Sequence, residues 1–323
     1  MNKDEARIHW SDEKEVVKTS IPLKVTLFFV KHVPGCIVRT ILHIISFFFY
    51  VFAGRARYEA KLYQKQLKIF SAGRVPEKIK VLRQIDSFAL CVIEKMYGWL
   101  GKYNFENIEY QHDDIDQILA DLKAGKGVFL FTSHLGNMEL LRSLSENNKK
   151  LVGRDVPVFV VMDTKVTAQF SSILASINSR VNYNIIEASE IGPDTMVTLI
   201  DAVEGGGMVV IAGDRTSSTN REKVLHQSFL GREAAFPYGS FLIPFLLKVP
   251  VYYLFALRNG YKKGEPVYNF FIEKSKIDFT CTREQRESCI KACCAEYAQK
   301  LEKFCLKFPY QWYNFFNFWN LDL

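Results

Sequence analysis

Between residues 127 and 307, short apolar segments alternate with longer amphipathic ones. The short segments predict strands and the longer ones predict helices. Strands are expected at residues 127–132, 157–162, 183–187, 208–212, 250–257 and 267–273. Helices are expected at residues 113–124, 138–146, 164–178, 193–204, 238–248 and 282–307. Strands joined through helices require crossover connections, so we expect an α/β fold with a mostly parallel central sheet flanked by helices.

The region before these elements is the most hydrophobic part of the chain, with its densest run at residues 41–53. That run is too short to span a bilayer, which takes about 20 apolar residues. A helical hairpin or re-entrant element lying in the membrane interface fits it better, and an ordinary buried helix is the alternative. The basic residues that follow would each add roughly 1 kcal/mol of attraction to an anionic leaflet. We therefore expect a membrane-associated helical region at residues 1–75 and a second domain at residues 76–323, which opens with a helical pattern at residues 76–101.

The net charge and the aromatic content of the chain limit the kinds of molecule it is expected to bind. The chain of 323 residues carries a formal net charge of +7, and 14% of its residues are aromatic. Both features suit either nucleic acid or an anionic membrane surface. The chain has no RNP-like aromatic motif, no zinc-finger spacing and no dense basic stripe, so we expect a membrane surface and no nucleic acid. The first 24 residues mix acidic and basic side chains, unlike a secretory signal peptide.

Seven cysteines are present, and five of them lie between residues 281 and 305. Their clustering raises the question of a metal site. Small apolar residues at helical spacing more often line a packed helix face, so we expect no metal and no cofactor. An odd number of cysteines without paired spacing fits the reducing cytoplasm.

Two polar segments follow expected strands, where ligands gather in parallel sheets. The first contains His134 and Glu139, and the second contains Asp214 and Arg215. A neutral imidazole is the usual general base near physiological pH, and a carboxylate fixes its tautomer. One interpretation of the first segment is therefore His134 as a base with Glu139 as its partner, and Gly136 and Asn137 as the turn and cap between them, although this spacing alone is a weak signal. The alternative is that this histidine and glutamate serve only packing.

Four blocks in order give the chain a resemblance to a known family. They are SHLGNMELLR (133–142), MVVIAGDR (208–215), FLGREAAFPYGSFLIPFLLKVPVYYLFALR (229–258) and QWYNFFNFW (311–319). Together they resemble the lysophospholipid acyltransferase superfamily, and within it the lipid A late acyltransferases. The chain departs from that branch after Asp214, where it reads Arg-Thr-Ser-Ser. It also has EIGP (190–193), a feature associated with the predicted acyltransferases of the aryl-polyene-cluster type.

The resemblance implies metal-free acyl transfer from acyl carrier protein or coenzyme A to a lipid acceptor, on the cytoplasmic face of the inner membrane. It implies that His134 is the base and Glu139 its partner, within an acyltransferase domain at residues 76–323. The remaining candidate substrate-binding residues are Asn137, Asp214, Arg215, Arg232, Gly239 and Ser240. Arginine suits phosphate or carboxylate because its planar fork matches those groups. The terminal aromatic block is expected to pack the last helix against the sheet.

Two other functions remain open. The fold is able to serve as an inactive module that binds acyl chains or acyl carrier protein, although the intact His134 and Glu139 argue against it. A hydrolase would use the same base to activate water. No G-x-S-x-G elbow is present, and Ser133 directly precedes the base, which disfavours it as a nucleophile.

Overall fold

A computed structural model of the chain describes residues 21–100, 102, 107–111, 114–140, 151–163, 183–216 and 221–319. The helix expected at residues 164–178 lies outside the described residues, as does the second part of the one expected at residues 138–146.

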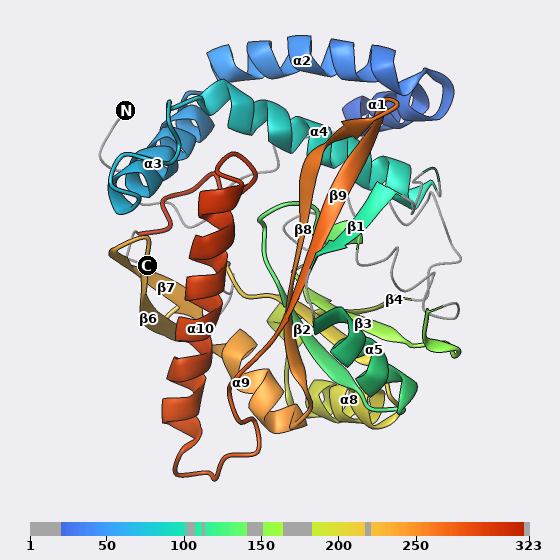
Figure 1. The fold of residues 1–323 in the computed structure, drawn as a ribbon, viewed down its shortest axis with the longest axis vertical. Coiled ribbons are helices and arrows are strands. Elements are labelled where there is room, and N and C mark those ends of the chain that lie inside the picture. The colour runs from blue at the N-terminus through green and yellow to red at the C-terminus, as the bar shows by residue number, and fades with distance from the viewer. Residues whose placement is uncertain are drawn as a thin grey trace.

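A seven-stranded sheet with the order β1-β9-β8-β2-β5-β3-β4 forms the centre of the molecule (Figure 1). Its strands are β1 (Ile108–Gln111), β2 (Val128–Thr132), β3 (Val158–Met162), β4 (Tyr183–Glu187), β5 (Met208–Ala212), β8 (Val251–Lys262) and β9 (Glu265–Lys274). Neighbouring strands pair in parallel, except for the antiparallel hairpin of β8 and β9. The prediction of an α/β fold with a mostly parallel, helix-flanked sheet is therefore confirmed.

The sheet buries both of its faces, which explains why its inner strands read as continuous apolar runs. All five residues of β2 are buried. Phe129 and Phe131 point to one face and join the main core with helix α10 (Arg286–Lys307). Val128 and Leu130 point to the other face and join a second core with α5 (Asp114–Lys123). The alternation of side chains along a strand thus divides one apolar run between two cores.

Several expected boundaries differ from the observed ones. β8 continues to Lys262, beyond the expected residue 257, because its outer end is a polar, exposed hairpin without an apolar pattern. Helix α10 begins at Arg286, four residues after the expected start at residue 282. The strands β1, β6 (Val224–Phe229) and β7 (Arg232–Pro237) were not expected, and the last two form a separate two-stranded sheet. Helices α8 (Pro193–Glu204) and α9 (Tyr238–Leu247) lie where the sequence predicts them.

The cysteines of α10 lie in the core. Cys293, Cys294 and Cys305 are buried there, and all seven cysteines of the chain are free. Among the residues that the structure describes, no three His, Cys, Asp or Glu side chains gather as a metal site would require.

Among the described residues, four helices precede the sheet, and the first three are α1 (Ile21–His32), α2 (Gly35–Phe52) and α3 (Gly54–Phe70). Figure 1 shows α2 at the outer edge of the molecule, with α4 (Val81–Trp99) between it and the sheet. Only 11% of α2 is buried, and by length and composition it is apolar enough to cross a membrane. A buried core helix does not expose such a face. Membrane contact stays a prediction, for which one apolar helix near the N-terminus is weak evidence.

Helix α3 packs with the sheet domain, although it precedes the expected boundary at residue 75. Tyr63 and Leu67 belong to the main hydrophobic core. The Gln66 side-chain amide donates a hydrogen bond to the Leu230 carbonyl at 2.7 Å. The chain from residue 54 onward therefore contributes to the same core as the sheet.

This packing gives a stability prediction for α3. Leu67 is fully buried, so Leu67→Ala should lower the free energy of unfolding by about 2–5 kcal/mol through lost contacts and a residual cavity. Ile69 on the same helix is 72% exposed, so Ile69→Ala should change it by less than about 0.5 kcal/mol. Chemical denaturation of both variants checks the difference. Equal effects would show that α3 is not part of the core.

Candidate functional site

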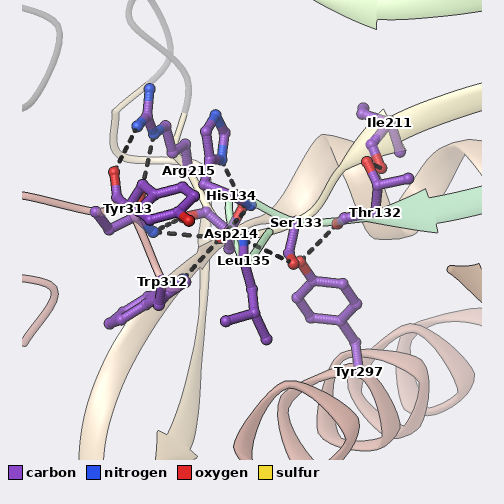
Figure 2. A network of polar contacts seen from close by, with 11 residues as sticks. Thr132, Ser133, His134, Leu135, Ile211, Asp214, Arg215, Tyr297, Trp312 and Tyr313 are labelled. Carbon is purple, nitrogen blue, oxygen red and sulfur yellow. Dashed lines mark hydrogen bonds and ion pairs between the residues drawn. The ribbon is translucent and has the colours of Figure 1, made fainter. Parts of the chain in front are cut away.

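The register between β2 and β5 brings His134 and Asp214 together. Thr132 and Ala212, the last residues of these parallel strands, are paired. His134 and Asp214 each follow two residues later, so both side chains leave the same edge of the sheet. Their closest atoms, Nδ1 of His134 and Oδ1 of Asp214, are 2.8 Å apart (Figure 2). The two segments predicted to share the carboxyl edge of the sheet therefore meet there.

The Asp214 carboxylate is fully buried and accepts several hydrogen bonds. The backbone N–H of His134 lies 2.9 Å from Oδ2 and 3.1 Å from Oδ1. The Trp312 indole N–H and the Asn314 amide donate to Oδ2 at 3.0 Å and 3.2 Å. Burial alone would raise the pKa of Asp214, but the His134 imidazole, the Trp312 N–H and the Arg215 charge hold it below its usual range. Asp214 is therefore an ionised acceptor at neutral pH.

The His134 imidazole is neutral and partly open to solvent. Its side chain is 24% exposed. Burial and the positive charge of Arg215 lower its pKa below the ordinary value, and the opposing effect of Asp214 does not restore it. Since the ionised Asp214 only accepts hydrogen bonds, Nδ1 carries the imidazole proton and Nε2 keeps a lone pair. This is the protonation state that a general base requires.

The terminal aromatic block (residues 311–319) pairs with the backbone of the segment that carries His134. Leu135 and Trp312 form an isolated antiparallel bridge. On either side of it, the Tyr313 N–H donates to the His134 carbonyl at 3.0 Å, and the Gly136 N–H donates to the Gln311 carbonyl at 2.9 Å. The block was expected to pack the last helix against the sheet. Its Trp312 is buried in the main core, and the block also holds the segment that carries His134.

Helix α4 presents a row of polar residues to the same segment. The Gln84 amide donates to the Trp312 carbonyl at 2.7 Å, and the Cys91 thiol lies 3.6 Å from the Gly136 carbonyl. Glu94 pairs with Arg258 at 2.8 Å, and both side chains are almost entirely buried. Together with Ser87, the positions Gln84, Cys91 and Glu94 are spaced at three or four residues and form one helix face. The apolar periodicity of the helix predicts only its apolar face, although the spacing of Gln84, Ser87, Cys91 and Glu94 is also present in the sequence.

Glu139, the expected partner of His134, occupies a different position. It lies in the short 3-10 helix η4 (Met138–Leu140) and is half-buried. Among the described residues, Asp214 and not Glu139 contacts the imidazole. The chain turns between the two residues because Gly136 has a φ of 83° and the Asn137 N–H donates to the Ala256 carbonyl at 2.8 Å. The sequence predicted that Glu139 pairs with the His134 imidazole, whereas in the structure Asp214 does so.

Two of the other expected site residues, Arg215 and Asn137, lie on the segments that follow β5 and β2. Arg215 lies beside His134, with its Nε 3.0 Å from the Asn314 amide oxygen, and Figure 2 shows both side chains pointing to the same side. Asn137 is fully buried next to the Tyr268 hydroxyl, at 3.4 Å.

Three further candidates lie on elements away from the imidazole. Arg232 is exposed at the start of β7, above the Trp319 ring at 5.5 Å. Gly239 and Ser240 lie in the first turn of α9, and Ser240 is buried. Among the described residues, no hydrogen bond or ion pair joins any of these three to His134.

No protein-family model matches the chain, and no curated protein is significantly similar to it. The arrangement of the site residues is therefore the basis for inferring what the protein does.

The turn at Gly136 gives a sharp test of how the site is held. A Cβ at this position would lie 2.1 Å from the Ala256 carbonyl oxygen, so Gly136→Ala should lower the free energy of unfolding by roughly 3 kcal/mol or more. Gly125 is the matched control, because it also has a positive φ, of 76°, but nothing within 4 Å of an added Cβ. Gly125→Ala should cost only the backbone strain, about 1–2 kcal/mol. Similar losses measured by denaturation would contradict the close approach at Gly136.

Proposed function

We propose that this protein is an acyltransferase. It moves a fatty acyl group from an acyl carrier protein or coenzyme A thioester to a hydroxyl or amine of a membrane lipid or lipid precursor. The observation that carries the proposal is the neutral His134 imidazole, held by the buried Asp214 at the carboxyl edge of the sheet and partly open to solvent. The resemblance of four sequence blocks to the lipid A late acyltransferases supports the choice of reaction.

The proposed reaction follows from the protonation state of the site. Nε2 of His134 takes the proton of the acceptor as its oxygen or nitrogen attacks the thioester carbonyl. The imidazolium that forms is stabilised by the Asp214 carboxylate, as in serine-protease triads. The tetrahedral intermediate then collapses, the carbon–sulfur bond breaks, and the imidazolium returns its proton to the leaving thiolate. The acyl group ends on the acceptor, and the carrier is released as a thiol.

The geometry favours Asp214 over Glu139 as the residue that orients His134. Asp214 contacts both the imidazole and the backbone N–H of the same residue, so it fixes the ring and the chain that carries it. Glu139, the partner expected from the sequence, lies on η4, beyond the turn at Gly136. We therefore propose the orienting role for Asp214 and a secondary role for Glu139.

The proposed location is the cytoplasmic face of the inner membrane. The large apolar side chains exposed along α2 include Ile44, Phe47, Phe48 and Phe52. Contact with a membrane would bury this face and bring the acyltransferase site close to lipid acceptors.

Substitutions in the site test the reaction and the two candidate partners together. General-base catalysis contributes about 10²–10⁴-fold, so His134→Ala should reduce acyl transfer by that factor. Asp214→Asn keeps the shape but removes the charge and should lose about 10²-fold or more. Glu139→Gln should lose less than either. The measurement is acyl transfer by purified variants, with acyl carrier protein and coenzyme A donors and a panel of lipid acceptors.

The double variant H134A/D214N should be little worse than His134→Ala alone, because a base and its orienting partner act as one unit. Thermal melting of each variant separates a catalytic loss from unfolding. Full activity in His134→Ala would remove the base and promote the inactive binding module. Full activity in Asp214→Asn, with a severe loss in Glu139→Gln, would return the partner role to Glu139.

The membrane assignment has its own test. Phe48 on α2 is 55% exposed and Val197 on α8 is 56% exposed, which makes them a matched pair of exposed apolar residues. Phe48→Asp should weaken flotation with vesicles that contain anionic phospholipid, because it places a charge in the apolar face. Val197→Asp should leave flotation unchanged. Equal flotation of both variants and the wild type would exclude α2 as the membrane-binding element.

A further inference from the structure

One side of α2 is apolar and open, and the opposite side is bound to the rest of the molecule. Val38 and Ser46 are buried on the bound side. Exposed apolar side chains recur every three or four residues along the open side, at Ile37, Ile41, Ile44, Phe48 and Val51. Because this spacing follows the helical repeat, the exposed side chains form one apolar stripe that runs along most of α2.

Polar contacts fix the bound side of α2 at two places. The Arg39 guanidinium donates a hydrogen bond to the Gly264 carbonyl, in the turn between β8 and β9, and lies over the Tyr261 ring at 4.6 Å. Nδ1 of His43 lies 2.7 Å from Oδ1 of Asp86 on α4. Helix α2 therefore lies across the outer side of α4 and does not project from the molecule (Figure 1).

A small apolar core joins both N-terminal helices to α4. Val30 of α1 and Val38 of α2 are buried there together with Ile93 and Met96 of α4. The other side of α1 is open, and Phe28 on it is 60% exposed. The two helices are thus anchored to α4 from one side and leave apolar side chains uncovered on the other.

An orientation of α2 across a membrane conflicts with these contacts. His43 is the ninth of the 18 residues of α2, so in a spanning helix it would lie near the bilayer midplane. Its partner Asp86 would be drawn to the same depth, and Arg39 would draw in the exposed turn that carries Lys262 and Lys263. Charged side chains and open strand ends are strongly disfavoured in the hydrocarbon core. The contacts of α2 are compatible with membrane binding only when the helix lies along the bilayer surface.

The charge of this region favours a lipid surface over a second copy of the chain. The sequences of α1 and α2 contain no acidic residue, whereas Lys24 and Lys31 are basic and exposed. Two facing copies would bring these positive charges together without a counter-charge. Anionic lipid headgroups supply that counter-charge, and an apolar stripe accompanied by basic residues is typical of helices in the membrane interface.

We infer that α2 lies in the plane of the membrane, with its apolar stripe among the lipids and its inner side still docked on α4. The protein then enters one leaflet and does not cross the bilayer, although α2 is long and apolar enough to do so. The docked contacts of Arg39 and His43 remain outside the hydrocarbon core in this orientation.

This orientation sets the distance between His134 and the leaflet. Helix α4 contacts α2 through Asp86, and it contacts the segment after His134 through the Cys91 thiol, 3.6 Å from the Gly136 carbonyl. Packed helices are about 8–10 Å apart, so one helix layer separates the site from the membrane-facing helix. The acceptor is then a lipid of the same leaflet. That consequence rests on the proposed function, whereas the orientation of α2 does not.

Spin labels along the apolar stripe measure the orientation on vesicles that contain anionic phospholipid. In the full-length background, serine replaces the three cysteines that are not buried, Cys36, Cys281 and Cys289. Labels on Ile37→Cys, Ile44→Cys and Val51→Cys should all lie about 5–10 Å deep in EPR power saturation. A spanning helix would separate the first and last labels by about 21 Å along the bilayer normal and place the middle one deepest. The control label on Val197→Cys, in α8 at the opposite end of the molecule (Figure 1), should stay in water.

A covalent link between α2 and α4 tests whether the helix stays docked. His43→Cys and Asp86→Cys, in the same background, place two thiols across an existing contact, and a short bis-maleimide joins them. Flotation with the vesicles should be equal before and after cross-linking, because α2 binds the membrane without leaving α4. The same double variant without the cross-linker controls for loss of the contact. A cross-link that abolishes flotation overturns the docked orientation.

The remaining outcomes separate this inference from the proposed reaction. A label at Ile44 that lies much deeper than the other two overturns the in-plane orientation. Labels that all stay in water overturn membrane contact by α2, and a lipid-free dimer that Phe48→Asp dissociates in light scattering would then assign the stripe to a second copy of the chain. An absence of acyl transfer in the wild type contradicts the proposed function alone, because label depth and flotation require no turnover.

Discussion

The buried Asp214 carboxylate joins three segments that are far apart in the sequence. Its acceptor oxygens receive hydrogen bonds from the end of β2, through His134, and from the terminal block, through Trp312 and Asn314. A buried carboxylate without such donors would carry a large desolvation penalty. The hydrogen bonds therefore stabilise the charge, and the charge in turn fixes the position of the segments that donate them. The position of His134 therefore depends on its hydrogen bonds to Asp214, a residue far away in the sequence.

A second layer of buried polar contacts supports the turn that follows His134. The backbone of Arg258 exchanges hydrogen bonds with the Gln311 side chain, at 2.9 Å and 2.7 Å. Gln311 in turn accepts from the Gly136 N–H. On the outer side, the Tyr261 hydroxyl donates to Glu94 at 3.0 Å, and the Arg39 guanidinium of α2 lies over the Tyr261 ring at 4.6 Å. Contacts between named atoms thus extend from the exposed apolar helix to the turn beside the imidazole.

Two opposite influences set the pKa of His134. A carboxylate alone would raise the pKa of His134 and favour the charged imidazolium. Burial and the charges of Arg215 and Lys95 lower the pKa of His134, so the imidazole is neutral at physiological pH. The Asp214 charge remains available to stabilise the imidazolium once a proton is taken. A base that is neutral at rest and stabilised when protonated suits the proposed acyl transfer at neutral pH.

From the sequence alone, six of the seven strands of the described sheet were predicted, together with helices α5, α8, α9 and α10, whereas β1 was missed. Strands such as β2 and β5 are short and almost entirely apolar, so their pattern is a local property of the chain. The sequence also determined that His134 and Asp214 lie at one edge of the sheet, because the carboxyl ends of parallel strands share that edge. Strands β6 and β7 were not readable, since neither has a regular apolar alternation: β6 buries only Leu225 and Phe229, and β7 begins with two exposed charged residues before four buried ones. Only the tertiary structure decided which carboxylate meets His134. That choice depends on the register of β2 against β5, across 80 residues of sequence, whereas Glu139 stands nearer in the chain but beyond the turn at Gly136.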